Sequence, residues 1–133
     1  GFREIAGDNC VVHFASDYAF DAGRSAMEEL IAQNRLAKAF FCGDDVIAIG
    51  ASSALRANGR TVPGDVGLIG VNGMEISGWD NVDLTTFRQP VDQIASAVIE
   101  RLRERMENPS SAHKAIRFEP TLIERGSLRR VRN

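Results

Sequence analysis

The chain has 133 residues, 44% of them hydrophobic and 26% charged, and its formal net charge is −2. This length predicts one domain with a real core, and the near-neutral charge argues against a nucleic-acid-binding surface. No apolar run approaches the ~20 residues that a membrane span needs, and no charged-then-apolar leader opens the chain. Cys10 and Cys42 lie in apolar stretches, which is typical of reduced thiols, so we expect a cytoplasmic protein with no membrane contact.

The first predicted strand covers residues 10–14, which are β-branched and aromatic at their centre. A loop that contains Asp17 and Tyr18 follows this strand. Asp21 is a suitable N-cap for a helix whose apolar stripe continues to about Asn34.

Residues 39–42 form a continuous apolar run, which predicts a strand buried on both faces, as in a parallel sheet. Asp44 and Asp45 come directly after it, and a helical apolar pattern then continues as far as Asn58. One of these carboxylates therefore lies where a strand ends and a helix begins. At that position it can bind a ligand, or it can simply cap the helix and favour its dipole.

A third strand is predicted over residues 66–71, and it ends in the polar pair Asn72–Gly73. Residues 83–88 have the composition of a short strand. The clearest helix covers residues 91–107, because apolar side chains recur there on one face. Residues 115–119 and 121–127, on either side of Pro120, alternate in polarity and suggest extended structure at a sheet edge.

Strands that alternate with helices predict an α/β fold with a parallel sheet and helices on both faces. The loops after such strands meet at one edge, so Tyr18, Asp44 and Asn72 are expected to converge. Asp and Asn bind the hydroxyl and amine groups of a sugar or nucleoside, and Tyr18 or Phe20 offers an aromatic face. Each also has a structural alternative: a helix cap, a turn, or a ring that seals the core.

The enzyme signals are weak. Gly43-Asp44-Asp45 is similar to a metal-binding acidic turn, but three residues recur by chance and no further ligands have matching spacing. No nucleophile elbow, Gly-rich phosphate loop or dinucleotide fingerprint is present. We therefore predict no catalytic residue, no metal and no cofactor, and keep a metal-dependent enzyme only as a weaker alternative.

Four ordered segments resemble the C-terminal half of lactose-repressor (LacI/GalR) family transcriptional regulators. The first two are an acidic pair followed by an apolar helix and a Gly-x-x-Val-Pro turn that leads into a strand. The others are the Leu-Thr-Thr segment and the closing Leu-x-x-Arg-x-Ser motif. They occupy residues 44–51, 55–70, 84–90 and 122–127.

The resemblance implies a two-lobed effector-binding domain of the periplasmic-binding-protein type I fold, with a DNA-reading helix-turn-helix ahead of it. Residues 1–133 would be the C-terminal lobe, and the helix over 91–107 would return to an N-terminal lobe that this chain lacks. The implied protein is a homodimeric repressor that binds DNA only through the absent domain. A periplasmic sugar-binding protein of the same fold is the alternative.

The resemblance also implies which residues bind a small effector, most simply a carbohydrate, between the lobes. They are Asp17, Tyr18, Asp44, Asn72 and Gln89. The chain departs from the family at two of these positions, because Asp44 stands where the family has Asn and Asn72 where it has Asp. The acidic group of the site is thus kept but moved.

Overall fold

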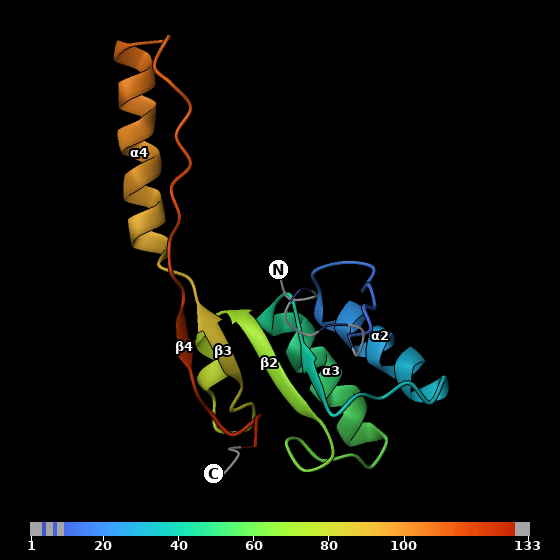
Figure 1. The fold of residues 1–133 in the computed structure, drawn as a ribbon. Coiled ribbons are helices and arrows are strands. Elements are labelled where there is room, and N and C mark those ends of the chain that lie inside the picture. Colours follow the sequence, from blue (N-terminus) through green and yellow to red (C-terminus); the bar gives the residue numbers. More distant parts are fainter. Residues whose placement is uncertain (1–3, 5–6, 8–9, 130–133) are drawn as a thin grey trace.

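A computed structural model describes residues 4, 7 and 10–129 of the chain, and Figure 1 shows their arrangement. Helices and strands alternate through most of the described residues, as expected for an α/β protein. The elements are α2 (Phe20–Ala32), β1 (Ala39–Phe41), α3 (Asp45–Ala57), β2 (Gly67–Asn72), the 3-10 helix η2 (Glu75–Gly78), β3 (Thr85–Arg88), α4 (Val91–Glu107) and β4 (Thr121–Ile123).

The four strands form one sheet in the order β1-β2-β3-β4. The β1–β2 and β2–β3 pairs are parallel, and β4 is antiparallel to β3 at the edge. The predicted α/β class is therefore confirmed, and the predicted parallel sheet is mostly parallel, with β4 as its antiparallel edge strand. Because three strands run in the same direction, the segments that follow β1, β2 and β3 leave from the same end of the sheet.

The core lies between the sheet and α3, and α2 packs on α3 (Figure 1). Leu68 of β2 and Leu55 of α3 are fully buried there. Alternate residues of the strands point to the opposite face, where Phe41, Val71 and Phe87 line an open hollow. The described part of the chain has no helix long and apolar enough to cross a membrane.

The closing Leu-x-x-Arg-x-Ser motif fastens the end of the chain to the sheet. The Ser127 hydroxyl donates to the Leu68 carbonyl at 2.6 Å and accepts the Thr85 amide at 2.8 Å. The Arg125 guanidinium donates to the Leu84 carbonyl at 2.6 Å. This motif therefore supplies hydrogen-bond partners for buried backbone groups of two strands.

Helix α4 stands away from the rest of the molecule, together with the segment that returns from its end (Figure 1). Its predicted bounds, 91–107, are those observed, but none of its residues is buried. Of the residues expected in extended edge structure, 121–127 contain the edge strand β4, whereas residues 115–119 are extended without strand pairing. We call α4 and residues 108–120 the arm.

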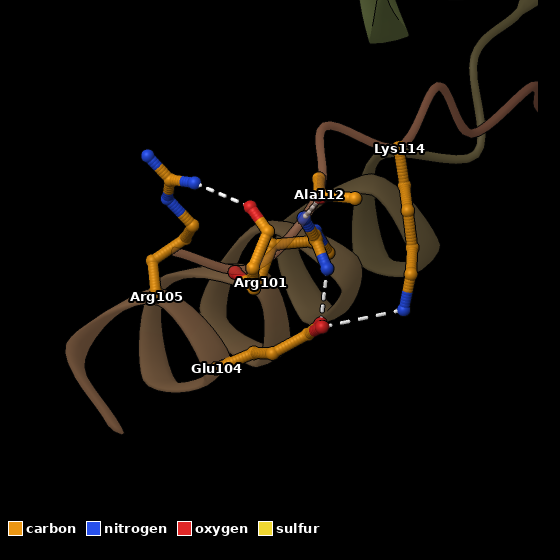
Figure 2. Close-up of polar contacts among 6 residues, drawn as sticks. Arg101, Glu104, Arg105, Ala112 and Lys114 are labelled. Carbon is orange, nitrogen blue, oxygen red and sulfur yellow. Dashed lines mark hydrogen bonds and ion pairs between the residues drawn. The ribbon is translucent and has the colours of Figure 1, made fainter. Parts of the chain in front are cut away.

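Polar contacts hold the two parts of the arm together (Figure 2). The Arg101 and Arg105 guanidinium groups donate to the carbonyls of Ala112 and Ser111, at 2.9 and 2.6 Å. Glu104 accepts from Arg101, and also from Lys114 at 3.3 Å. These bonds lower the pKa of Glu104, the bond from Arg101 most strongly.

Three local predictions were wrong. Residues 10–14 form no strand, and Phe14 is 86% exposed, because β1 is the last strand of the described sheet and no neighbour pairs with this segment. The second concerns β1, which is not buried on both faces: Phe41 is 43% exposed, because it lines the open hollow on the face of the sheet opposite α3. Asp21 is not the N-cap of α2. That position is Ala19, which makes no side-chain cap bond, and Asp21 lies in the first turn.

Candidate functional site

Asp44 occupies the turn between β1 and α3, as the sequence predicts. One of its carboxylate oxygens, Oδ1, accepts the Val46 amide at 2.7 Å and caps α3. The other oxygen, Oδ2, accepts a hydrogen bond from the side chain of Asn72 at 2.5 Å. Asp44 therefore has the structural role of a helix cap and, through its second oxygen, a place in a polar network at the edge of the sheet.

Asn72 ends β2 in a left-handed conformation, with φ of 106°, and Gly73 follows with φ of 67°. The side-chain amide of Asn72 makes a hydrogen bond through each of its polar atoms: the nitrogen donates to Asp44, and the oxygen accepts from Gln89 Nε2 at 2.6 Å. We call Asp44, Asn72 and Gln89 the polar chain. It joins the segments that follow β1, β2 and β3.

Two hollows adjoin the polar chain. A polar hollow of about 380 Å³ is lined by Asn72, Gly73, Arg88, Gln89, Pro90, Val91, Asp92 and Gln93. An apolar hollow of about 400 Å³ is lined by Phe41, Val71, Phe87, Gln89, Pro90, Ile94, Phe118 and Pro120. Gln89 and Pro90 line both, so hydrogen-bonding groups and aromatic surface meet at the root of the arm.

This arrangement suits a small polyhydroxylated ligand. The second N–H groups of Asn72 and Gln89 remain available as donors, and the Gln89 carbonyl and Asp44 carboxylate can accept. The rings of Phe41 and Phe87 lie 6.3 Å apart and offer apolar area beside these groups. Sugar hydroxyls both donate and accept, and the C–H face of a sugar packs on aromatic rings.

Asp17 and Tyr18 are not brought into this network. Asp17 accepts the backbone amide of Tyr18 at 2.6 Å, and Tyr18 is 74% exposed. Among the described residues, no hydrogen bond joins either of them to the polar chain. Phe20, the other aromatic candidate, lines a separate hollow with Ser52 and Arg56 on α3. The predicted ligand-binding roles of Asp17 and Tyr18 stay predictions. They assume that residues 10–14 form a strand of the sheet, which would bring the following loop to the same edge as Asp44 and Asn72.

Asp45, the other half of the acidic pair, does not face either hollow. It is fully buried, and its carboxylate accepts the Thr86 hydroxyl at 2.5 Å and the Met74 amide at 2.7 Å. The sequence alone leaves the role of Asp45 undecided and does not single out Thr86. The available signal is that only one of two adjacent carboxylates can cap the helix.

No group of three or more His, Cys, Asp or Glu side chains that could hold a metal ion occurs in the described part of the chain. His13 Nε2 lies 3.2 Å from Glu29 Oε2 on α2, apart from the polar chain. The acidic pair at 44–45 is already engaged by backbone amides, a side-chain amide and a hydroxyl.

Cys42 is buried beside Asp45, and both cysteines are free thiols. Burial, with a smaller contribution from the nearby Asp45 charge, raises the pKa of Cys42 to about 12. At pH 8 only roughly one thiol in ten thousand is then ionised. We expect a thiol reagent such as iodoacetamide to modify half-buried Cys10 in the folded chain and to leave Cys42 unmodified until urea unfolds it. Peptide mass spectrometry measures both, and rapid labelling of native Cys42 would contradict the burial.

The chain matches the model of the periplasmic binding protein-like domain over residues 2–128. It belongs to that family. It is 33% identical over 112 residues to the HTH-type transcriptional repressor PurR of Klebsiella pneumoniae, which covers 84% of this chain and 33% of PurR. It is 29% identical to the ribose operon repressor of Haemophilus influenzae, over 85% of this chain and 34% of that protein. The expected LacI/GalR relationship is thereby confirmed.

A solved structure of this family, the complex of the transcriptional regulator CelR with cellobiose, has the same architecture. Its TM-score is 0.85 at 26% identity, and the match covers 95% of this chain and 40% of that one. The matched region spans about a third of the length of PurR and of the ribose operon repressor.

Proposed function

We propose that the chain is the effector-sensing lobe of a LacI/GalR-type transcriptional repressor, and that its effector is a small carbohydrate. The observation that carries this proposal is the polar chain of Asp44, Asn72 and Gln89, in which Gln89 lines both the polar and the apolar hollow and Asn72 lines the polar one. The names of two similar proteins support the ligand class, since one is a ribose operon repressor and the other is complexed with cellobiose.

In this proposal the arm completes the binding site. Helix α4 buries none of its own residues, and its root at Pro90 lines both hollows. We propose that α4 docks on an N-terminal lobe and that the effector lies between the lobes. An effector that binds the closed form more tightly than the open form shifts the equilibrium between DNA-competent and DNA-incompetent homodimers. DNA would be read in the cytoplasm by a separate helix-turn-helix domain.

Calorimetry on the intact protein with a panel of sugars and nucleosides tests the proposal. We expect a ligand in the sugar set, and we expect Asp44→Ala to weaken its binding by at least ~1.5 kcal/mol, the scale of one hydrogen bond to a charged group. That is a loss of about tenfold in affinity.

Asp44→Ser is the matched control for the helix cap. A serine hydroxyl can still cap α3, but it lacks the second oxygen that accepts from Asn72. We expect Asp44→Ser to retain stability and lose affinity like Asp44→Ala. Unchanged affinity in both variants would exclude Asp44 from the site. If the gene encodes a signal peptide upstream of this segment, and not a helix-turn-helix, the protein is instead a periplasmic binding protein.

A further inference from the structure

The buried carboxylate of Asp45 makes hydrogen bonds to β3 and to the segment that follows β2. Asp45 is the first residue of α3 and has no exposed surface. Its Oδ1 accepts the Thr86 hydroxyl of β3 at 2.5 Å, and its Oδ2 accepts the backbone amide of Met74 at 2.7 Å. A buried carboxylate needs such donors, so these contacts favour one position of the segment that follows Asn72.

Thr86 also binds the residue before Met74, which is Gly73. Its hydroxyl oxygen accepts the amide of Gly73 at 3.2 Å while its hydrogen goes to Asp45. The two amides that follow Asn72 in the chain are therefore both held by this pair of side chains. Gly70 makes room for the arrangement, because a Cβ at that position would overlap Asp45 Oδ1.

Asn72 needs this support more than an ordinary residue would. Its φ of 106° lies in a region that residues other than glycine rarely adopt, and such a conformation persists only where its surroundings hold it. In this conformation the side-chain amide of Asn72 makes its hydrogen bonds with Asp44 and Gln89.

We infer that Asp45 and Thr86 are positioning residues for the effector site, which hold the Asn72–Gly73 turn so that the Asn72 amide stays in the polar chain. The inference rests on the proposed function only for its effect on affinity. The hold on the turn itself is a property of the ligand-free protein.

Thr85 provides a matched control. It precedes Thr86 on β3, it is equally buried at 1% exposure, and its hydroxyl also makes two hydrogen bonds. Those bonds go elsewhere: it accepts the Arg125 amide at 2.9 Å and donates to the Arg125 carbonyl at 3.1 Å. Thr85→Val and Thr86→Val thus remove the same chemical group from the same depth, on opposite faces of one strand.

Hydrogen–deuterium exchange in the intact, ligand-free protein separates the two positions. We expect Thr86→Val to speed exchange of the Gly73 and Met74 amides at least ~5-fold and to leave Arg125 as it was. Thr85→Val should speed exchange of the Arg125 amide and leave Gly73 and Met74 unchanged. Thr86→Ser, which keeps the hydroxyl, should restore the slow exchange. If the valine variants do not fold, the alanine pair at the same two positions gives the same comparison.

Calorimetry with the sugar identified for the wild-type protein completes the test. We expect Thr86→Val to weaken binding at least ~10-fold and Thr85→Val, at comparable loss of stability, to weaken it less than ~2-fold. Equal losses in the two variants, or unchanged exchange at Gly73 in Thr86→Val, would overturn the inference. If no sugar binds the wild-type protein, the proposed function fails, and the exchange experiment still decides whether Asp45 and Thr86 hold the turn.

Discussion

The isolated 133-residue chain is expected to self-associate at micromolar concentration through α4. Several large apolar side chains are more than half exposed along this helix, although they repeat on one face at the spacing of a buried stripe. They are Val91, Val98, Ile99, Leu102 and Met106, at 63%, 52%, 53%, 59% and 82% exposure. Burying each contributes up to about 1.5–3 kcal/mol, so two copies gain by packing these helices face to face or by exchanging arms.

Light scattering measures the mass directly, and paired substitutions test the face. Val98→Glu with Leu102→Glu places two charges on the apolar stripe and should reduce the mass to that of one chain. Gln93→Glu with Ser96→Glu also adds two negative charges to α4, but away from the apolar stripe, and should leave the association intact. A one-chain mass for the unsubstituted protein would show that the arm is stable in water, and the proposed docking of α4 on a second lobe would lose its physical basis.

Helix α4 shows what a local pattern can predict. Its apolar residues recur with helical spacing along its whole length, and the predicted bounds of 91–107 are those observed. The strand predicted over 66–71 is displaced by one residue from β2 (Gly67–Asn72). In both cases the information lies within the segment itself, in periodicity or in a continuous apolar run between polar turns.

The segment over 10–14 shows where a local pattern is insufficient. Its β-branched and aromatic residues have strand propensity, but a strand exists only when a neighbour accepts its hydrogen bonds. The described sheet ends at β1, and Val11 and Phe14 are largely exposed. The expected position of Tyr18 depended on that strand, so it could not be predicted more reliably than the strand itself.

The candidate site was predictable in part. Asp44 and Asn72 were identified because each follows a predicted strand, and Gln89 was identified through the family resemblance. The structure joins all three by hydrogen bonds. The contact of Asp45 with Thr86 spans 41 residues of sequence, and no local sequence pattern around either residue predicts it. It required the register of β2 and β3, which only the folded sheet supplies.

Gly50→Ala is expected to destabilise the protein by at least ~2 kcal/mol, although alanine is the better helix former. In a solvent-exposed helix interior the same change would stabilise by about 0.5–1 kcal/mol. Here a Cβ at Gly50 of α3 would overlap the backbone of Phe20 and Arg24 in α2, and reciprocally a Cβ at Gly23 of α2 would overlap the backbone of Ile47 in α3. Backbone atoms cannot rotate away as a side chain can, so the two helices must separate.

Urea unfolding of the intact protein measures the change, and Gly43→Ala is its control. A Cβ at Gly43 would meet no atom of the described residues within 4 Å, its two chain neighbours aside, so this substitution should alter the free energy of unfolding by less than ~0.5 kcal/mol. The sign at Gly50 decides between two physical effects, because propensity predicts a gain and steric overlap predicts a loss. A stabilised Gly50→Ala variant would mean that α2 and α3 can move apart at little cost, and that their packing does not fix the position of Asp44 at the start of α3.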